Sequence, residues 1–175
     1  TANNETQLKT RTFAEVTKWL TMAINGHWFE STVLSVRPAP WFDGLLKNQL
    51  QIDTGYYYAQ GQLWSEENPD AFAGIHNPSG VNLIFDEASG IVKPIWKVSE
   101  GFFTEPTLNR FWNVYSQPRR NSGGFYDCFN TEATAKRWRL RHLDRRTVEG
   151  QDIALAQAEI DEHGIDSDHV RVEIL

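Results

Sequence analysis

Apolar residues recur at helical spacing over residues 5–24, and this pattern predicts one long amphipathic helix near the start of the chain. The side chain of Asn3 or Asn4 is placed to cap its first turn, and Asn25-Gly26 is placed to end it. The stripe that should face a core consists of Leu8, Phe13, Val16, Trp19, Leu20, Ala23 and Ile24.

Short apolar or alternating runs predict the strands. The clearest run is Val81 to Phe85 (VNLIF), which only Asn82 interrupts, and Arg110 to Ser116 (RFWNVYS) resembles it. Both runs are typical of buried strands in a parallel sheet that is covered on both faces. Further strands are predicted at residues 32–36, 55–59, 137–143 and 170–174. In residues 137–143, Trp138, Leu140 and His142 alternate with arginines.

Helices are predicted between these strands. Pro94 is placed as the first-turn proline of a helix that continues to about Phe102, and Gly164 ends a helix over residues 149–163. Short helical segments are expected near residues 68–72 and 125–129. The alternation of helices and strands predicts an α/β fold with a mainly parallel sheet. The residues expected to face inward are Ile95, Val98, Phe102, Ile153, Ala156 and Ile160.

Length and composition narrow the class of protein. The 175 residues are enough for one domain, and seven Trp and ten Phe argue against a disordered segment. The single cysteine, Cys128, excludes an internal disulfide and a cysteine-built zinc site, and it favours a reducing compartment. Its aromatic neighbours predict that it is buried. No apolar run approaches the roughly 20 residues that cross a bilayer, so we expect no membrane association.

Charge is unevenly distributed along the chain. Residues 119–146 hold eight basic and three acidic side chains, whereas residues 149–175 hold eight acidic side chains and one basic one. The overall net charge of −6 is therefore a poor guide to binding partners, and the local basic segment is a better one. The acidic stretch at residues 161–169 does not match the spacing of a calcium-binding loop. We interpret it as the solvated end of a helix, and His27 and His76 as structural or surface residues.

Asp86 and Glu87 follow the clearest strand directly. Open α/β sheets bind their ligands at the carboxyl ends of their strands. In nucleotide-hydrolysing proteins the first acid at this position holds Mg²⁺, and the second can activate water. The alternative is an exposed acidic turn after a core strand.

Several further segments, before and after this pair in the chain, form a recognisable combination with it. The segments are Thr1 to Gln7 (TANNETQ), Trp64 to His76 (WSEENPDAFAGIH), Ser116 to Phe129 (SQPRRNSGGFYDCF), His142 to Gly150 (HLDRRTVEG) and Asp166 to Leu175 (DSDHVRVEIL). Together with the acidic strand they resemble the ATPase domain of the large terminase subunit of tailed bacteriophages and prophages. The resemblance extends over nearly the whole chain, and residues 37–61 carry it least.

The resemblance implies a three-layer P-loop NTPase fold of the additional-strand type, with helices on both faces of the sheet. Asp86 would hold Mg²⁺ through a water molecule, and Glu87 would polarise the water that attacks ATP. Ser116 and Gln117 would sense the γ-phosphate. The family commonly has Gly-Asn-Pro where this chain has Ser-Gln-Pro, and the longer Gln117 side chain alters the geometry.

Five arginines are candidates for contacts with DNA or with a neighbouring subunit. Arg119 and Arg120 directly follow Ser116-Gln117-Pro118 and are candidates for sensing the nucleotide or for acting in trans on a neighbouring subunit. Arg137, Arg139 and Arg141 would contact either DNA phosphates or such a nucleotide, or form the solvated face of an edge strand. The implied partners are double-stranded DNA, the small terminase subunit, the portal protein and further copies of the chain, all in the cytoplasm of a bacterial host.

No segment matches G-x-x-x-x-G-K-[ST], the loop that binds nucleotide phosphates. The resemblance implies that residues 1–175 are a partial ATPase domain that lacks the P-loop strand and the nuclease domain. Without that loop, we expect the chain to be inactive alone. Two other interpretations remain. The chain could belong to a helicase-like DNA translocase, or it could be a degenerate, non-catalytic prophage remnant that binds DNA or protein.

Overall fold

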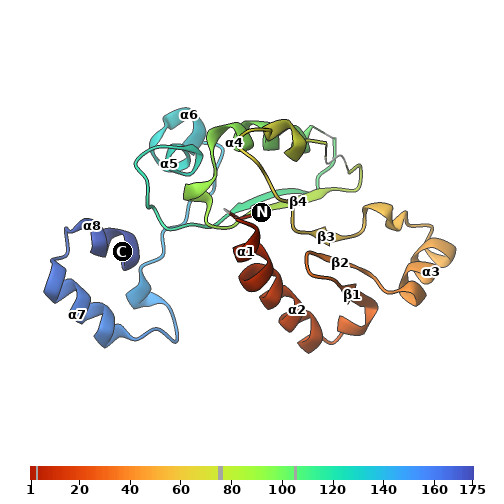
Figure 1. Ribbon diagram of the computed structural model, residues 1–175, viewed down its shortest axis with the longest axis horizontal. Helices are drawn as coiled ribbons and strands as arrows, with labels where there is room; N and C mark the ends of the chain where they lie inside the picture. Colours follow the sequence, from red (N-terminus) through yellow and green to blue (C-terminus); the bar gives the residue numbers. More distant parts are fainter. Residues whose placement is uncertain (3, 75–76, 105) are drawn as a thin grey trace. The chain divides into compact units, whose positions relative to one another are not determined.

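The computed structural model describes residues 1–2, 4–74, 77–104 and 106–175, which form helices and two small sheets (Figure 1). The chain divides into two compact units. Unit 1 comprises Thr1–Glu87 and Ile91–Tyr115, and unit 2 comprises Ala88–Gly90 and Ser116–Leu175. The mixture of helices and strands predicted from the sequence is confirmed. Asn3 and His76, for which a cap and a surface position were predicted, lie outside the described residues.

Unit 1 begins with a helical rod in three parts. They are α1 (Glu5–Gln7), the π-helical segment η1 (Leu8–Thr12) and α2 (Phe13–Met22). Asn4 caps the rod, because its side chain accepts a hydrogen bond of 2.7 Å from the backbone N–H of Gln7. Leu8 and Phe13 are buried against Val36, as the apolar stripe predicts. The stripe is nevertheless wrong at its far end, where Val16, Trp19 and Ile24 are exposed.

The rod packs on an antiparallel sheet of order β1-β2-β3, with strands β1 (Phe29–Ser31), β2 (Ser35–Pro38) and β3 (Ala59–Gln60). The strand predicted at residues 32–36 begins later, because residues 32–35 form a turn closed by the bond of Thr32 N–H to Ser35 O. The strand predicted at residues 55–59 is wrong except at Ala59, which belongs to β3. Gly55 and Tyr56 lie in the 3₁₀ turn η3 (Thr54–Tyr56), and Tyr57 and Tyr58 have no regular structure. Two further helical elements, η2 (Gly26–Trp28) and α3 (Pro40–Gln49), flank β1 and β2 in the chain.

A second sheet pairs β4 (Val81–Phe85) with β5 (Arg110–Val114) in parallel, with Phe85 opposite Val114. Both predicted strands are confirmed, although β5 is two residues shorter than expected. Gly80 fits the entry to β4 because its φ is +131° and a Cβ atom there would meet Asn109 O at 2.4 Å. The expectation of a mainly parallel sheet thus holds for one of the two sheets.

The apolar runs predicted that both faces of this parallel sheet are buried. This prediction is wrong for the described residues. Leu83 and Phe85 are buried, whereas Ile84 on the opposite face is 44% exposed and Phe111 is 56% exposed. Asn82 and Asn113 form a 2.8 Å hydrogen bond across the two strands. The runs therefore alternate between a core face and an open face, and Asn82 belongs to the open one.

Aromatic side chains fill the core face. The helical elements η4 (Pro69–Phe72), α4 (Lys93–Ser99) and η6 (Glu100–Phe103) supply rings to it, and Pro94 lies in the first turn of α4 as predicted. The ring of Phe85 lies 5.1 Å from that of Trp96 and 5.3 Å from that of Trp112. Ile95 and Phe102 are buried, which confirms two of the three inward positions predicted there, while Val98 is half-buried.

Thr1 extends the hydrogen bonding on the other side of β4. Its nitrogen donates to Ile84 O at 2.5 Å, and Asp86 N–H donates to Thr1 O at 2.8 Å. This is the pattern of two parallel strands, with Thr1 beside Phe85. The chain enters beside β4, as Figure 1 shows, and then continues into the rod.

Unit 2 is helical throughout its described elements. These are η5 (Ala88–Gly90), α5 (Gly124–Asn130), α6 (Glu132–Ala135), η7 (Arg145–Thr147), α7 (Ile153–His163) and α8 (Asp168–Glu173). The predicted helix near residues 125–129 and the burial of Cys128 are confirmed, and the helix predicted over residues 149–163 forms but begins later, at Ile153. Ala156 and Ile160 face the core as expected, but Ile153 is exposed.

Two predicted strands of unit 2 are wrong. Residues 137–143 continue from α6 as a turn and then run without regular structure, because Arg137 and Trp138 bond back to the carbonyls of Thr134 and Ala135. Residues 170–174 belong mostly to α8, in which Val170 and Ile174 are one helical turn apart and both are buried. The acidic segment before α8 is a helix end at Gly164, as interpreted from the sequence.

Candidate functional site

The acid pair of unit 1 lies where β4 ends. Because β4 and β5 are parallel and in register, their carboxyl ends lie at one edge of the sheet. Tyr115 N–H donates to Phe85 O at 2.9 Å, so the pairing continues to the last residue of β4. Asp86 and Glu87 follow directly, which is where the sequence placed them.

The carboxylate of Asp86 is held in place by the rod. Its Oδ2 atom accepts a 2.8 Å hydrogen bond from the Thr12 hydroxyl, and the side chain is half-buried. Thr12 is the last residue of the π-helical segment, a wide helical turn that is rare and often occurs at functional sites. The sequence gave no sign of this partner, since 74 positions separate Thr12 from Asp86.

Glu87 has an unusual backbone conformation. Its φ is +54°, and among the described residues only Gln51 is another non-glycine residue with a positive φ. Such a conformation costs about 1–2 kcal/mol, and residues that adopt it cluster at active sites. The carboxylate is half-buried and makes no hydrogen bond or ion pair with any described residue. It is therefore available to water or to a ligand.

Ser116 and Gln117 belong to unit 2, where both are tied into local hydrogen bonds. The Ser116 hydroxyl accepts from Ser89 N–H at 2.9 Å and donates to Gln117 O at 3.0 Å. The Gln117 amide donates to Glu173 at 2.8 Å and accepts from Arg119 Nε at 2.7 Å. Both ends of the amide thus have protein partners, and Glu173 is a member of this group that sequence reasoning missed.

The arginines of unit 2 other than Arg137 fall into two sets. Arg119 contacts Glu173 at 3.3 Å, Arg145 contacts Glu159 at 3.2 Å and Arg146 contacts Asp144 at 2.6 Å. The hydrogen bonds from Arg146 lower the pKa of Asp144 to about 2. Arg120, Arg139, Arg141 and Arg171 are exposed and make no ion pair with a described residue, so these four side chains remain open to phosphate.

Asp86 and Glu87 are the carboxylates at this sheet edge that could hold a metal ion together with water. Throughout the described ranges, no three His, Cys, Asp or Glu side chains gather as a metal-binding group. Mg²⁺ commonly keeps several waters and binds through one or two carboxylates together with substrate phosphates. One carboxylate at a strand end, oriented by a hydroxyl, suits that mode.

Comparison with protein-family models, with curated proteins and with solved structures found no match. None of the helices in the described part of the chain has the length and apolar character needed to cross a membrane.

Proposed function

We propose that unit 1 carries the metal-binding and water-activating acids of a nucleotide-hydrolysing motor, and that this motor is a phage-type terminase large subunit that packages double-stranded DNA. The observation that carries the proposal is the pair Asp86-Glu87 at the carboxyl end of a parallel strand, with one acid oriented and the other free. The P-loop NTPase architecture is part of the same proposal.

Each acid has a distinct task in this proposal. Asp86, oriented by Thr12, would hold Mg²⁺ through a bound water, and Mg²⁺ would neutralise the charge of the ATP phosphates. The free carboxylate of Glu87 would accept a proton from the water that attacks the γ-phosphate. The strained backbone of Glu87 supports this division, because residues in such conformations cluster at active sites.

The entry of the chain also supports the proposal. Thr1 lies beside Phe85 in a parallel arrangement and α1 begins at Glu5, which suits a passage from strand to helix within Thr1 to Gln7, one of the segments that carry the resemblance. In unit 2, Ser116 and Gln117 retain the phosphate-sensing roles that the resemblance implies. The network of Gln117, Arg119 and Glu173 would have to open before Gln117 contacts a ligand.

A helicase-like DNA translocase is the second candidate, because its sites also pair a strand with an Asp-Glu end. Cleavage of concatemeric DNA by the protein that contains this chain would favour the terminase, whereas strand separation would favour the translocase.

The metal-binding part is testable on this chain alone. Addition of Mn²⁺ and ATP to the ¹⁵N-labelled chain should broaden the amide signals of Asp86 and its neighbour Thr12 by paramagnetic relaxation. Asp86→Asn should abolish this broadening, while Glu87→Gln should keep it. Asp70→Asn, a change at an exposed acid in η4, serves as the matched control. Broadening that is unchanged in Asp86→Asn would refute the proposed metal site.

A further inference from the structure

The antiparallel sheet of unit 1 carries an open hollow of about 250 Å³ lined by Phe29, Val36, Tyr57, Tyr58 and Ala59. Three of its five lining residues are aromatic, and a fourth, Val36, is buried. The rings of Phe29 and Tyr57 lie 6.2 Å apart and are tilted by 52°, so they do not close the space by stacking on each other. The hollow is smaller than the roughly 300–1,000 Å³ of pockets for drug-sized ligands, and it suits a single planar ring system.

Two of the lining tyrosines face solvent. Tyr57 is 46% exposed and Tyr58 is 39% exposed, although aromatic side chains bury large apolar areas when they can. Aromatic rings that stay accessible on a sheet provide stacking surfaces, and nucleobases stack on such rings regardless of their identity.

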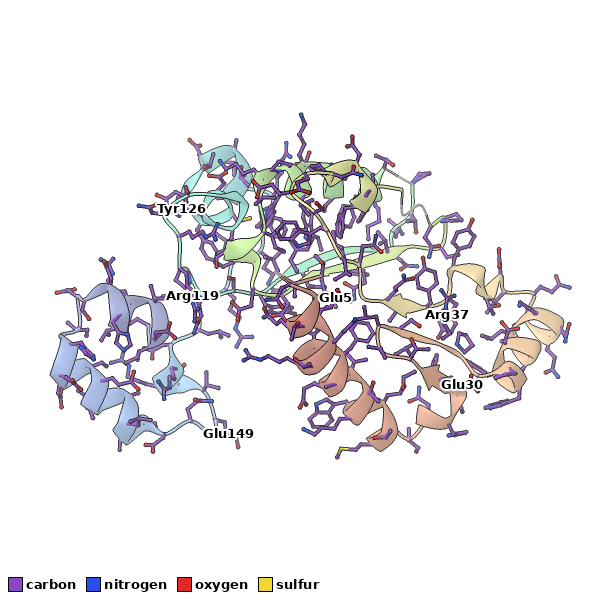
Figure 2. All side chains as sticks on the ribbon, in the orientation of Figure 1. Glu5, Glu30, Arg37, Arg119, Tyr126 and Glu149 are labelled. Atoms are coloured by element: carbon purple, nitrogen blue, oxygen red, sulfur yellow. The ribbon has the colours of Figure 1, made fainter. Side chains whose placement is uncertain are left out.

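A cation stacks on one of the rings that line this hollow. The Arg37 guanidinium lies 4.7 Å from the centre of the Tyr58 ring, and Figure 2 shows Arg37 on the same sheet as Glu30. Arg37 is exposed, and no carboxylate of the described residues forms an ion pair with it, not even that of its register partner Glu30. A guanidinium that is held by stacking keeps its N–H groups free for a phosphate.

We propose that this hollow binds one nucleotide unit, with the base stacked on Tyr57 and Tyr58 and the phosphate on Arg37. The source is either single-stranded nucleic acid or a free nucleotide, since both supply a planar base joined to a phosphate. A proline-rich peptide would also fit an aromatic groove, but it leaves the charge of Arg37 unmatched. This site is separate in the sequence from the acid pair, and it gives residues 37–61 a role that the nucleotide-hydrolysing proposal does not supply.

The test measures binding of fluorescently labelled oligothymidylate, twelve nucleotides long, in EDTA by anisotropy. Tyr57→Leu should weaken binding about tenfold, because each stacked base contributes about 1–3 kcal/mol. Tyr57→Phe, the matched control, keeps the ring and should bind like the unaltered chain. Arg37→Gln should weaken binding and reduce the salt dependence by about 0.7 in the log–log slope, as expected for one lost contact to a single strand. Glu30→Gln should tighten binding.

Competition by AMP identifies the source. Full competition by AMP at concentrations near that of the oligonucleotide would assign the site to free nucleotides, and absence of competition would assign it to the single strand. Binding that Tyr57→Leu and Arg37→Gln leave unchanged would overturn the proposal, as would no binding of either probe. Displacement of the oligonucleotide by decaproline with equal dependence on Tyr57 would do the same, since it assigns the hollow to peptides. Amide shifts of Ala59 in the ¹⁵N spectrum verify that each variant is folded and show where the probe binds.

Discussion

At the scale of single residues, Glu87 shows best how a site differs from a core. Leu83 and Phe85 of β4 are buried in the core, whereas the backbone of Glu87 has φ +54° and its carboxylate has no partner among the described residues. A residue that combines strain with a free charged group contributes little to stability and is a candidate for function.

The strain of Glu87 can be measured. Glu87→Gly should be more stable to urea unfolding than Glu87→Ala by about 1 kcal/mol, because glycine adopts a positive φ without the steric cost of a Cβ atom. Gln51, with the same φ, is the matched control, and Gln51→Gly should exceed Gln51→Ala by a similar amount. Equal stabilities for the Glu87→Gly and Glu87→Ala variants would show that the backbone is unstrained.

The sequence predicted the positions of Asp86 and Glu87 but could not predict their surroundings. An apolar run followed by two acids locates a strand end, because strand periodicity is local. The bond from Thr12 to Asp86 depends on where a helix of distant sequence is placed, and the bonds of Gln117 depend on the fold of α8. Neither leaves a local pattern that could be read in advance.

At the scale of elements, α8 shows how an apolar pattern can be ambiguous. Val170, Val172 and Ile174 fit a strand of period two, but Val170 and Ile174 also fit one helical turn. The helix start decides the matter, because the Ser167 hydroxyl accepts from Val170 N–H at 3.3 Å and Asp168 lies in the first turn. The cap signal was present in the sequence and outweighs three β-prone residues.

This cap gives a prediction for α8. Ser167→Ala should lower the free energy of unfolding by about 1 kcal/mol, as is typical for loss of an N-cap side chain. Ser122→Ala, at an exposed serine in the same unit, should change it little. Urea denaturation followed by circular dichroism measures both values, and equal stabilities would contradict the role of Ser167 as a cap.

The strand predicted at residues 137–143 does not form, for a related reason. Alternation is required for a half-buried strand, but a strand also needs a partner for its backbone groups. Here the first backbone N–H groups bond to the preceding turn of α6. Arg139 and Arg141 therefore do not share the face of a sheet, and any contact with DNA must come from an irregular segment.

At the scale of the whole molecule, the α/β class was predictable and the division into two units was not. The order of helices and strands follows from local patterns, whereas the sheet partners follow from contacts distant in the sequence. The hairpin-like connection of β1 and β2 forces them antiparallel, and the long connection from β4 to β5 allows a parallel pair.

The whole-chain prediction concerns turnover. We expect the 175-residue chain alone to release no measurable phosphate from ATP, because no segment matches the glycine-rich loop with its phosphate-binding lysine. Release of labelled phosphate should be the same for the unaltered chain and for Glu87→Ala. Activity that persists through repurification and disappears in Glu87→Ala would contradict this expectation.

The π-helical segment at Leu8–Thr12 has a consequence for how the rod tolerates changes in length. A π turn holds one residue more than an α turn, so the segment behaves like an insertion that the helix has absorbed. Deleting one residue there would restore a regular α-helix and rotate everything on one side by about 100° relative to the other. After such a rotation, Leu8 could not stay buried and Thr12 could not stay bonded to Asp86 while α2 keeps its present orientation. The extra residue thus sets the rotation between the two parts of the helix, so that the same helix packs on the antiparallel sheet and hydrogen-bonds to Asp86.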